Sequence, residues 1–281
     1  MEIVPDCAPQ IMGILNITPD SFSDGGDFIE PSQAVEHALG MERDGADIID
    51  IGGESTRPGA SRVTTAEQLR RVLPVIAALR SRLKEQTCIS IDTTRAEVAE
   101  RAIMAGVTMI NDISAGEEDP SLFTLAAEKQ ASIVLMHKQG IPASMQENPD
   151  YADLIREIRS YLLDRAALAI EAGVSADRII LDPGIGFGKT VQHNLQLLAN
   201  LADFTSMGFP LLLGASRKTT LAVICGVEDK KDLVGATCAT TAAGVLAGVR
   251  ILRVHDVKEN RQAADVAWAI RQQHGISSRT G

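Results

Sequence analysis

The chain has 281 residues, of which 45% are hydrophobic and 23% charged, and its 27 basic against 37 acidic side chains give a formal net charge of −10. This composition excludes intrinsic disorder, collagen and coiled coil as descriptions of the whole chain. The acidic balance argues against a nucleic-acid coat or a membrane-surface binder, although it leaves room for a local basic pocket.

Short aliphatic runs recur along the chain and predict eight strands. They are Ile11–Asn16, Ile48–Ile51, Ile89–Asp92, Met109–Asp112, Ile133–Met136, Ile179–Asp182, Leu211–Gly214 and Ile251–Val254. Continuous apolar runs of this kind are typical of strands buried on both faces of a parallel sheet. Amphipathic segments between them, such as Ala66–Leu83 and Leu154–Ala172, predict helices.

A glycine follows the helical pattern shortly before several of these strands, namely Gly45, Gly106, Gly173 and Gly248. Each is predicted to end its helix in the left-handed conformation. The eightfold alternation without a linker predicts a single α/β domain, a (β/α)8 TIM barrel, over residues 11–274, with a lead at 1–10 and a tail at 275–281. A doubly wound open sheet is the alternative, because alternation alone does not show closure.

The cysteines and the N-terminus predict a cytoplasmic protein. The four cysteines are widely spaced and form no C-x-x-C pair, which is typical of reduced thiols. The N-terminus has no basic region followed by an apolar core, so no secretory signal is expected. Apolar stretches are broken well before the ~20 residues of a membrane helix. We therefore expect neither a membrane nor a nucleic acid as partner.

Polar side chains follow nearly every predicted strand. They are Asn16, Glu54, Asp92, Asn111, Asp112, His137, Asp182, Ser216, Lys218, Arg253 and His255. In a barrel the C-terminal ends of all strands meet on one face, where barrel enzymes carry their catalytic residues. The sequence therefore predicts an active site on that face.

Two long loops follow the first and second strands, at Asn16–Glu30 and Gly52–Thr65. They are rich in Gly, Ser, Thr and Pro, and long loops at this face are often lids, so we expect them to be mobile before substrate binds. Arg57 lies among small residues and its guanidinium could bind an anion. A solvated loop and a solvated arginine are the simpler alternatives.

The carboxylates and the amide at three strand ends suit a planar heterocycle. Asp92, Asn111 and Asp182 can together recognise the donor and acceptor edge of such a ring. The alternative is that these side chains cap the following helices, an interpretation that suits Asp112 best.

The segments after the seventh and eighth strands carry cations. Lys218, Arg253 and His255 fall where barrels commonly bind phosphate, and Arg253 and His255, two residues apart, are expected to point to the same side. The nearby PGIGFGKT (183–190) is not a phosphate-binding P-loop, because Pro183 stands where its first glycine belongs. The role of His137 stays open.

Taken together, the motifs resemble those of bacterial dihydropteroate synthases over about residues 11–265. In chain order they are MGILNITPDSFSDGG, DIGGESTRPGA, ISIDTT, INDIS, LMHKQG, LDPGIGFGK, GASRK and RVHDV. The resemblance implies a folate-pathway transferase, a sulfonamide target, that forms a C–N bond between (7,8-dihydropterin-6-yl)methyl diphosphate and 4-aminobenzoate, with release of diphosphate. It also implies a TIM barrel, a Mg²⁺ cofactor and a homodimer.

The resemblance carries residue roles with it. For the pterin these are Asp92, Asn111, Asp182 and Lys218, with Met136 and Phe187 lining its faces. Asn16 would ligate Mg²⁺, and the diphosphate would be bound by Arg57, Arg253 and His255. The 4-aminobenzoate would lie beside Thr56, Pro58 and Ser216. Asp92, Lys218, Arg253 and His255 are the expected catalytic residues.

Two other functions remain open at this point. A methyltetrahydrofolate methyltransferase shares the pterin site but has no diphosphate to bind, so the cations after the last two strands argue against it. A silent paralogue acting as a partner subunit should have lost one of Asn16, Asp92, Lys218 or His255, and all four are present.

Overall fold

The computed structural model describes residues 8–18, 31–54, 63–140, 145 and 149–277. Its strands are β1 (Gln10–Asn16), β2 (Ile48–Gly52), β3 (Cys88–Asp92), β4 (Met109–Asp112), β5 (Ser132–Met136), β6 (Ile179–Asp182), β7 (Leu212–Leu213) and β8 (Ile251–Val254). Its helices are α2 (Pro31–Arg43), α3 (Thr65–Arg80), α4 (Ala96–Met104), α5 (Ser121–Lys129), α6 (Leu154–Glu171), α7 (Val191–Ala199), α8 (Leu201–Thr205), α9 (Thr219–Cys225), α10 (Val234–Ala247) and α11 (Val257–Ser277). Short 3-10 helices lie at Ala176–Arg178 and Lys230–Leu233.

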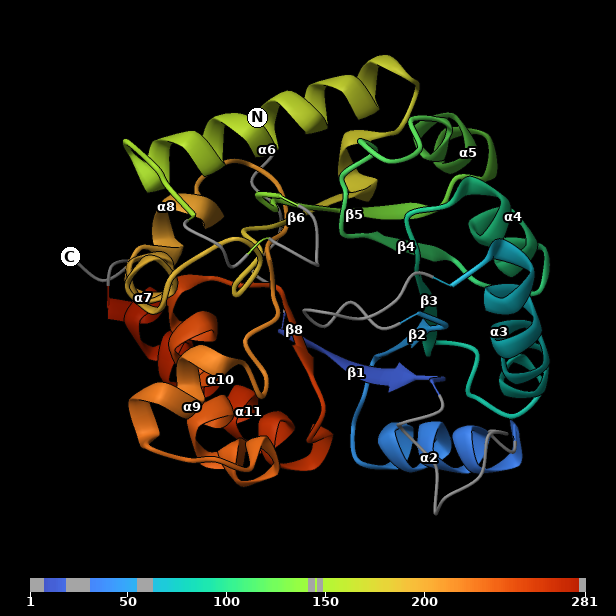
Figure 1. Cartoon of the computed structure of the whole chain (residues 1–281). Coiled ribbons are helices and arrows are strands. Elements are labelled where there is room, and N and C mark those ends of the chain that lie inside the picture. The colour runs from blue at the N-terminus through green and yellow to red at the C-terminus, as the bar shows by residue number, and fades with distance from the viewer. Residues whose placement is uncertain (1–7, 19–30, 55–62, 141–144, 146–148, 278–281) are drawn as a thin grey trace.

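The eight strands are parallel and form a barrel. Their order is β6-β5-β4-β3-β2-β1-β8-β7, and a bridge between Leu181 and Leu211 joins the two outer strands of that order. Figure 1 shows the strands at the centre and the helices around them. The predicted TIM barrel is confirmed, and the open sheet is not what the chain forms.

All eight predicted strands agree with the structure to within one residue at each end, and the seventh is shorter at both ends. Only Leu212–Leu213 forms β7, where Leu211–Gly214 was expected. Pro210 has no N–H to donate at the start of this segment, and Leu211 makes only the single bridge to β6. Beyond Leu213 the chain turns toward the barrel mouth, where Gly214 faces the Arg253 side chain.

Four glycines end their helices in the left-handed conformation, as predicted. Gly45, Gly106, Gly173 and Gly248 all have φ between +97° and +109°, the left-handed region. This conformation turns each chain from its helix into the next strand. At the other end of the chain, α11 continues to Ser277 and so passes the boundary expected at 275.

The core lies in two layers. Aliphatic side chains between the strands and the surrounding helices form the larger layer. The smaller layer fills the lower barrel interior, with Met12, Ile48, Met109, Val134, Ile180, Leu212 and Ile251. Above it the inward-facing positions become polar, beginning with Asp50 opposite Ser90. This change leaves a polar cavity at the C-terminal end of the barrel.

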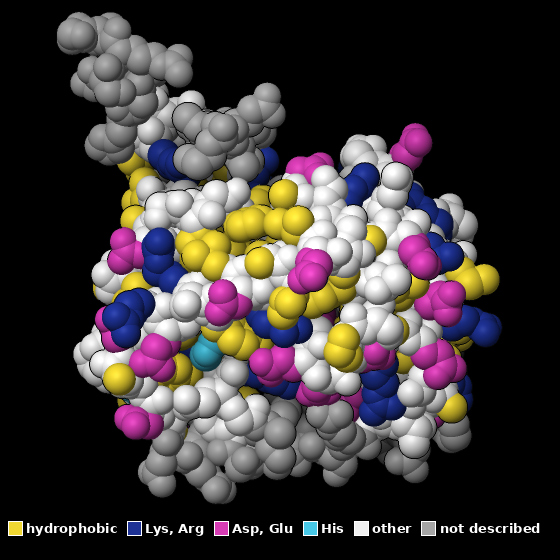
Figure 2. All heavy atoms as spheres, turned by 90° about the horizontal axis from the view of Figure 1, so that it is seen from above, with side chains coloured by type: hydrophobic (Ala, Val, Ile, Leu, Met, Phe, Trp, Pro, Cys, Tyr) yellow, Lys and Arg dark blue, Asp and Glu magenta, His cyan; other side chains and the backbone are white. Residues whose placement is uncertain are grey.

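The described surface on the side of α6 carries mixed charges (Figure 2). Figure 2 views the molecule from above, on the side of α6, and shows acidic and basic side chains interspersed with hydrophobic ones. Among the described residues of that face, no basic patch of the kind that binds nucleic acid stands out. In the described part of the chain, no helix combines the length and apolarity needed to span a bilayer.

Candidate active site

A cavity of about 340 Å³ opens at the C-terminal ends of the strands. It is lined by Asp92, Asn111, Ile113, Met136, Asp182, Gly184, Ile185, Phe187, Gly214, Lys218 and Arg253. All six residues predicted for the pterin therefore meet in one cavity, although they come from five different strands or the loops after them.

The carboxylates and the amide of this set come from neighbouring strands. Asp92 of β3 lies directly opposite Asn111 of β4, and Asp182 ends β6. All three side chains are buried. Asp182 Oδ1 accepts a hydrogen bond from the Gly184 N–H at 2.7 Å, while burial raises the pKa of this carboxyl group. A bound ring with N–H donors would supply the partners that the buried carboxylates need.

Arg253 connects two carboxylates of the barrel interior. Its Nε donates to Asp50 Oδ2 at 2.7 Å and its Nη2 donates to Asp92 Oδ2 at 2.8 Å. Asp50 Oδ2 also accepts from Asn111 Nδ2 at 2.9 Å. Burial raises the pKa of Asp92 to about 7; Arg253 opposes this shift and Asp50 adds to it. Asp92 can therefore exchange a proton near neutral pH.

Sequence reasoning gave Asp50 no role in this network. Its carboxylate is fully buried, and its position on β2 directly opposite Ser90 of β3 places it inside the barrel. An acidic residue inside an otherwise aliphatic strand was the signal that could have singled it out. Asp50 holds Asn111 and Arg253, two residues that line the cavity.

Lys218 lies over an aromatic wall. Its Nζ is 4.2 Å from the centroid of the Phe187 ring, a cation–π contact. Phe187 packs in a small apolar cluster with Ile113, Met136 and Met145. Burial, and then the nearby Arg253, lower the pKa of Lys218 to about 8. The ammonium group is thus held at the border between an apolar wall and the polar strand ends.

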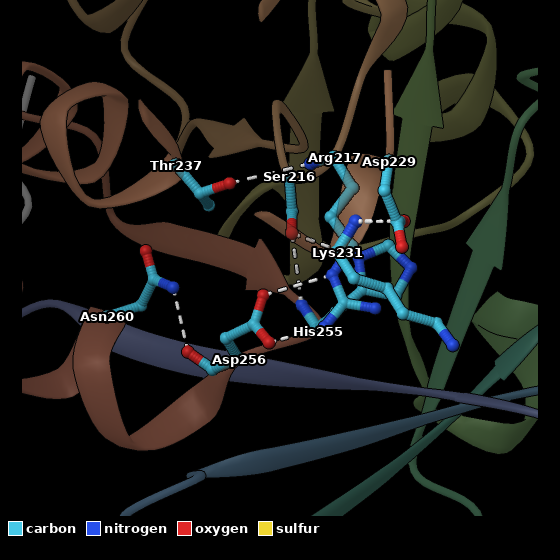
Figure 3. Close-up of polar contacts among 8 residues, drawn as sticks. All are labelled: Ser216, Arg217, Asp229, Lys231, Thr237, His255, Asp256 and Asn260. Carbon is cyan, nitrogen blue, oxygen red and sulfur yellow. Dashed lines mark hydrogen bonds and ion pairs between the residues drawn. The ribbon is translucent and has the colours of Figure 1, made fainter. Parts of the chain in front are cut away.

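Two contacts tie the segment after β7 to the end of β8 (Figure 3). Ser216 Oγ lies 2.9 Å from His255 Nδ1 and accepts from the His255 backbone N–H at 3.2 Å. The Arg217 guanidinium binds the Asp256 carboxylate through two nitrogens. Arg217 has φ +54°, a left-handed conformation that costs energy outside glycine. Sequence reasoning gave Arg217 and Asp256 no role, yet this ion pair fixes the turn that leads into Lys218.

Arg253 and His255 do not occupy the same environment. Arg253 lies in the cavity between Asp50 and Asp92, whereas His255 pairs with Ser216 beside it. Both belong to one mouth, but Arg253 contacts the residues predicted for the pterin rather than those predicted for the diphosphate.

Asn16 stands at the end of β1, opposite Gly52 of β2. A Cβ atom at Gly52 would lie 3.3 Å from Asn16 Oδ1 and 3.8 Å from Asp92 Oδ2, so both oxygens lie close to the backbone of Gly52 at the barrel mouth. A single amide oxygen suits Mg²⁺, which keeps waters and takes further ligands from phosphate groups. Within the described ranges, no group of three His, Cys, Asp or Glu side chains could hold a metal by itself.

The structure does not describe three of the predicted site residues or most of the two long loops. Thr56, Arg57 and Pro58 lie outside the described residues, as do 19–30 of the first loop and 55–62 of the second. Asp112 accepts from the Ser114 N–H at 2.8 Å and the Ser114 hydroxyl at 2.7 Å, so it stabilises the turn after β4. The next helix, α5, begins at Ser121 and has no side-chain cap, so the capping interpretation is wrong for Asp112.

Comparison with known proteins shows which proteins the chain resembles. A family profile described as pterin binding enzyme matches residues 12–255. A dihydropteroate synthase of Synechocystis is 48% identical over 260 residues, 92% of this chain and 89% of that protein. The Yersinia pestis dihydropteroate synthase, solved with a sulfonamide drug complex, superposes with a TM-score of 0.89 at 41% identity over 96% of both chains. That of Xanthomonas albilineans, solved with 4-aminobenzoic acid, gives 0.88 at 40% over 95% of this chain and 94% of the other.

Proposed function

Because the chain belongs to the family of pterin-binding enzymes, with a dihydropteroate synthase 48% identical over nearly its whole length, we infer that it catalyses the dihydropteroate synthase reaction. It is a transferase of folate biosynthesis. It joins (7,8-dihydropterin-6-yl)methyl diphosphate to 4-aminobenzoate and releases diphosphate. The observation that carries this conclusion is the meeting of Asp92, Asn111, Asp182 and Lys218 in one cavity walled by Met136 and Phe187.

We propose the following roles for the pterin residues. Asp182 accepts hydrogen bonds from the 2-amino group and ring N–H, and Asn111 and Lys218 bind other polar atoms of the ring. Phe187 and Met136 pack against its faces. A buried donor left without a partner costs about 1–3 kcal/mol, so this set selects a ring with the complementary edge.

The chemical step separates charge. The C–O bond between the pterin methylene and the diphosphate breaks, and the electron pair leaves with the diphosphate. The amine nitrogen of 4-aminobenzoate attacks the methylene carbon, a C–N bond forms, and the proton that this nitrogen loses passes to water. Ionised Asp92 stabilises the positive charge that develops on the pterin. Lys218, Arg253 and His255 stabilise the leaving group, and no strong general base is required.

Mg²⁺ is the proposed cofactor, with Asn16 as its protein ligand. The position of Asn16 at the end of β1, with its amide oxygen close to Gly52 at the barrel mouth, supports this assignment. When bound, the ion neutralises charge on the diphosphate.

The second substrate would lie at the rim. We propose that Thr56, Pro58 and Ser216 border 4-aminobenzoate and that Arg57 joins His255 in binding diphosphate. The position of Ser216 beside His255 supports adjacent sites for the two groups. A homodimer in the cytoplasm is the proposed form of the enzyme.

A turnover assay tests the function directly. Purified chain with Mg²⁺ and both substrates is expected to form 7,8-dihydropteroate and one equivalent of diphosphate, and a sulfonamide should compete with 4-aminobenzoate. Product that forms without 4-aminobenzoate, or no product from folded protein, would contradict the assignment. Asn16→Ala should need more Mg²⁺ for half-maximal rate, which is measured in the same assay.

A further inference from the structure

Two features that the reaction leaves unexplained, His137 and the lysine of the GKT sequence, lie together behind the pterin cavity. Lys189 is only 2% exposed. Its Nζ lies 2.9 Å from the carbonyl oxygen of Phe187, 3.3 Å from that of His137, and 3.0 Å from His137 Nδ1. A buried ammonium group needs acceptors for its three N–H bonds, and these three atoms supply them.

The contact defines the state of His137. Burial lowers the pKa of Lys189 to about 7, and the nearby Asp182 carboxylate opposes this shift. In its charged form Lys189 can only donate, so His137 Nδ1 is then the unprotonated acceptor and the ring proton lies on Nε2. Burial, and then the charge of Lys189, lower the pKa of His137 to about 3, so the imidazole stays neutral. The Tyr161 ring meets it edge-on at 4.9 Å between centroids. The orientation of the imidazole is therefore fixed from both sides.

Lys189 is one polar connection between two loops that touch through their backbones, beside the hydrogen bond from the Tyr151 hydroxyl to the Gly188 carbonyl. A Cβ atom at Gly184 would lie 1.9 Å from the His137 carbonyl oxygen, and one at Gly188 would lie 2.3 Å from that of Gln139. The loop after β6 thus packs directly on the loop after β5. The Lys189 ammonium group bridges the His137 carbonyl of one loop and the Phe187 carbonyl of the other.

One bridged carbonyl belongs to a residue that lines the cavity, and the other to the chain neighbour of such a residue. Phe187 lines it and carries Lys218 over its ring. His137 directly follows Met136, which also lines it. A shift between the two loops would move both sides of the apolar wall and the ammonium group of Lys218.

We propose that Lys189 and His137 form a buried clamp that positions Phe187, Met136 and Lys218 for the pterin. Both are positioning residues: neither lines the cavity among the described residues. The proposal rests on the proposed function, because it assumes that the cavity binds a pterin.

The first test replaces Lys189 by methionine, which keeps the length of the side chain and removes its three donors. Calorimetric titration with pteroic acid is expected to show at least about tenfold weaker binding, the loss that corresponds to one unsatisfied buried group. The KM for the pterin diphosphate should rise similarly, whereas the KM for 4-aminobenzoate should change less than about twofold.

Lys138→Met is the matched control. The side chain of Lys138 is only 5% exposed, but it pairs with Glu118. The variant should leave the affinity for pteroic acid within about twofold. Equal loss in both variants would mean that any lysine of these two loops with little exposed surface matters, and would overturn the clamp.

The second test varies the acceptor. His137→Asn keeps an acceptor oxygen near the Nδ1 position and should bind pteroic acid nearly as the wild type does. His137→Leu removes the acceptor and should bind at least about fivefold more weakly. If Lys189→Met fails to fold, this pair still decides the proposal, since equal affinities of the two His137 variants would contradict it.

A spectroscopic readout separates positioning from general stability. In protein with ¹⁵N-labelled histidine, the His137 ring, identified by its loss in His137→Asn, should show unprotonated Nδ1 and protonated Nε2. The Nδ1 resonance should shift in Lys189→Met. A proton on Nδ1 would overturn the clamp alone, whereas a wild type that binds no pteroic acid would overturn the proposed function as well.

Discussion

At the scale of single residues, burial sets the charge states on which the reaction depends. The cavity holds Asp92, whose pKa is raised to about 7, and Lys218, whose pKa is lowered to about 8. Both shifts have desolvation as their largest cause, because burial disfavours the charged form of either group. Burial at the barrel mouth therefore brings the pKa of the carboxyl group and the pKa of the ammonium group closer to neutral pH.

Asp182→Ala should abolish measurable pterin binding in a folded protein. The variant leaves the N–H donors of the ring without their buried acceptor, at about 1–3 kcal/mol each. Titration with pteroic acid measures the loss. Asp47→Ala is the control, because Asp47 pairs with the Ile11 N–H at the opposite end of the barrel. It should lower stability and leave affinity unchanged. Unchanged affinity of Asp182→Ala would refute the assignment.

Asp92 should make the protein less stable as pH rises from about 4 to 7. In this window the unfolded chain has released a proton that the folded chain still holds, since the folded pKa is raised from 3.8 to about 7. The free energy of unfolding then falls with increasing pH. Urea unfolding at several pH values should show a steeper decline for the wild type than for Asp92→Asn. Parallel curves would exclude the raised pKa.

The site residues that sequence analysis identified are those at strand ends. Asp92, Asn111, Asp182 and Lys218 could be predicted because a barrel brings all strand ends to one face. Asp50 and Lys189 could not, because their roles depend on partners far along the chain. Asp50 meets Arg253 across 203 positions and Lys189 meets His137 across 52. Only the folded chain determines which buried charges become neighbours.

At the scale of elements, the contact between the loops after β5 and β6 is the tightest part of the site. Gly184 and Gly188 have φ of +71° and +64°, and each lies against a carbonyl of the other loop. Glycine is required at both positions for conformation and for space.

Gly184→Ala should destabilise the fold and weaken pterin binding together. The new Cβ would lie 1.9 Å from a backbone oxygen, so the two loops must separate. Gly208→Ala is the matched control, because Gly208 has φ +85° and no atom within 4 Å of a new Cβ. It should show only the conformational cost of about 1–2 kcal/mol. Thermal unfolding and pteroic acid titration measure both effects, and equal losses would argue against loop contact.

The loops after β1 and β2 remain a prediction from composition. We expect 4-aminobenzoate to bind measurably only when diphosphate and Mg²⁺ are present, because Thr56 and Pro58 flank the proposed diphosphate ligand Arg57. Arg57→Ala should reduce this coupling more than it reduces pterin affinity. The measurement is titration of 4-aminobenzoate with and without Mg²⁺ and diphosphate. The same affinity under both conditions would mean that its site is preformed.

The strands themselves were predictable for a physical reason. Each is short, aliphatic and buried on both faces, so its pattern is continuous and its ends are polar. β7 is shorter than predicted, and Pro210 before it has no N–H to donate to the ladder. Boundaries of this kind depend on pairing with β6 and β8, which a single run of residues does not specify.

At the scale of the whole molecule, closure is what brings the site together. The bridge from β6 to β7 places Asp182 beside Gly214 and Arg253. In an open sheet these groups would lie along an edge. The sequence favoured closure through its eightfold alternation, but the pairing of the outer strands is visible only in the structure.

We expect the proposed homodimer to form through exposed apolar side chains on α9. Val223 and Ile224 on α9 are 60% and 52% exposed, and Figure 1 shows α9 beside α10 and α11, far from α4. Light scattering should give twice 30.0 kDa for the wild type and a lower mass for Ile224→Glu. Met104→Glu on α4, where Met104 is 74% exposed, should remain dimeric. A monomeric wild type would exclude the dimer.

A crystal structure of the chain with 7,8-dihydropteroate bound tests the central claim most directly. The account predicts the pterin ring in the cavity, with its 2-amino edge on Asp182, its face against Phe187, and its 4-aminobenzoate end at Ser216. A product bound elsewhere on the barrel, or a ring turned away from Asp182, would contradict it.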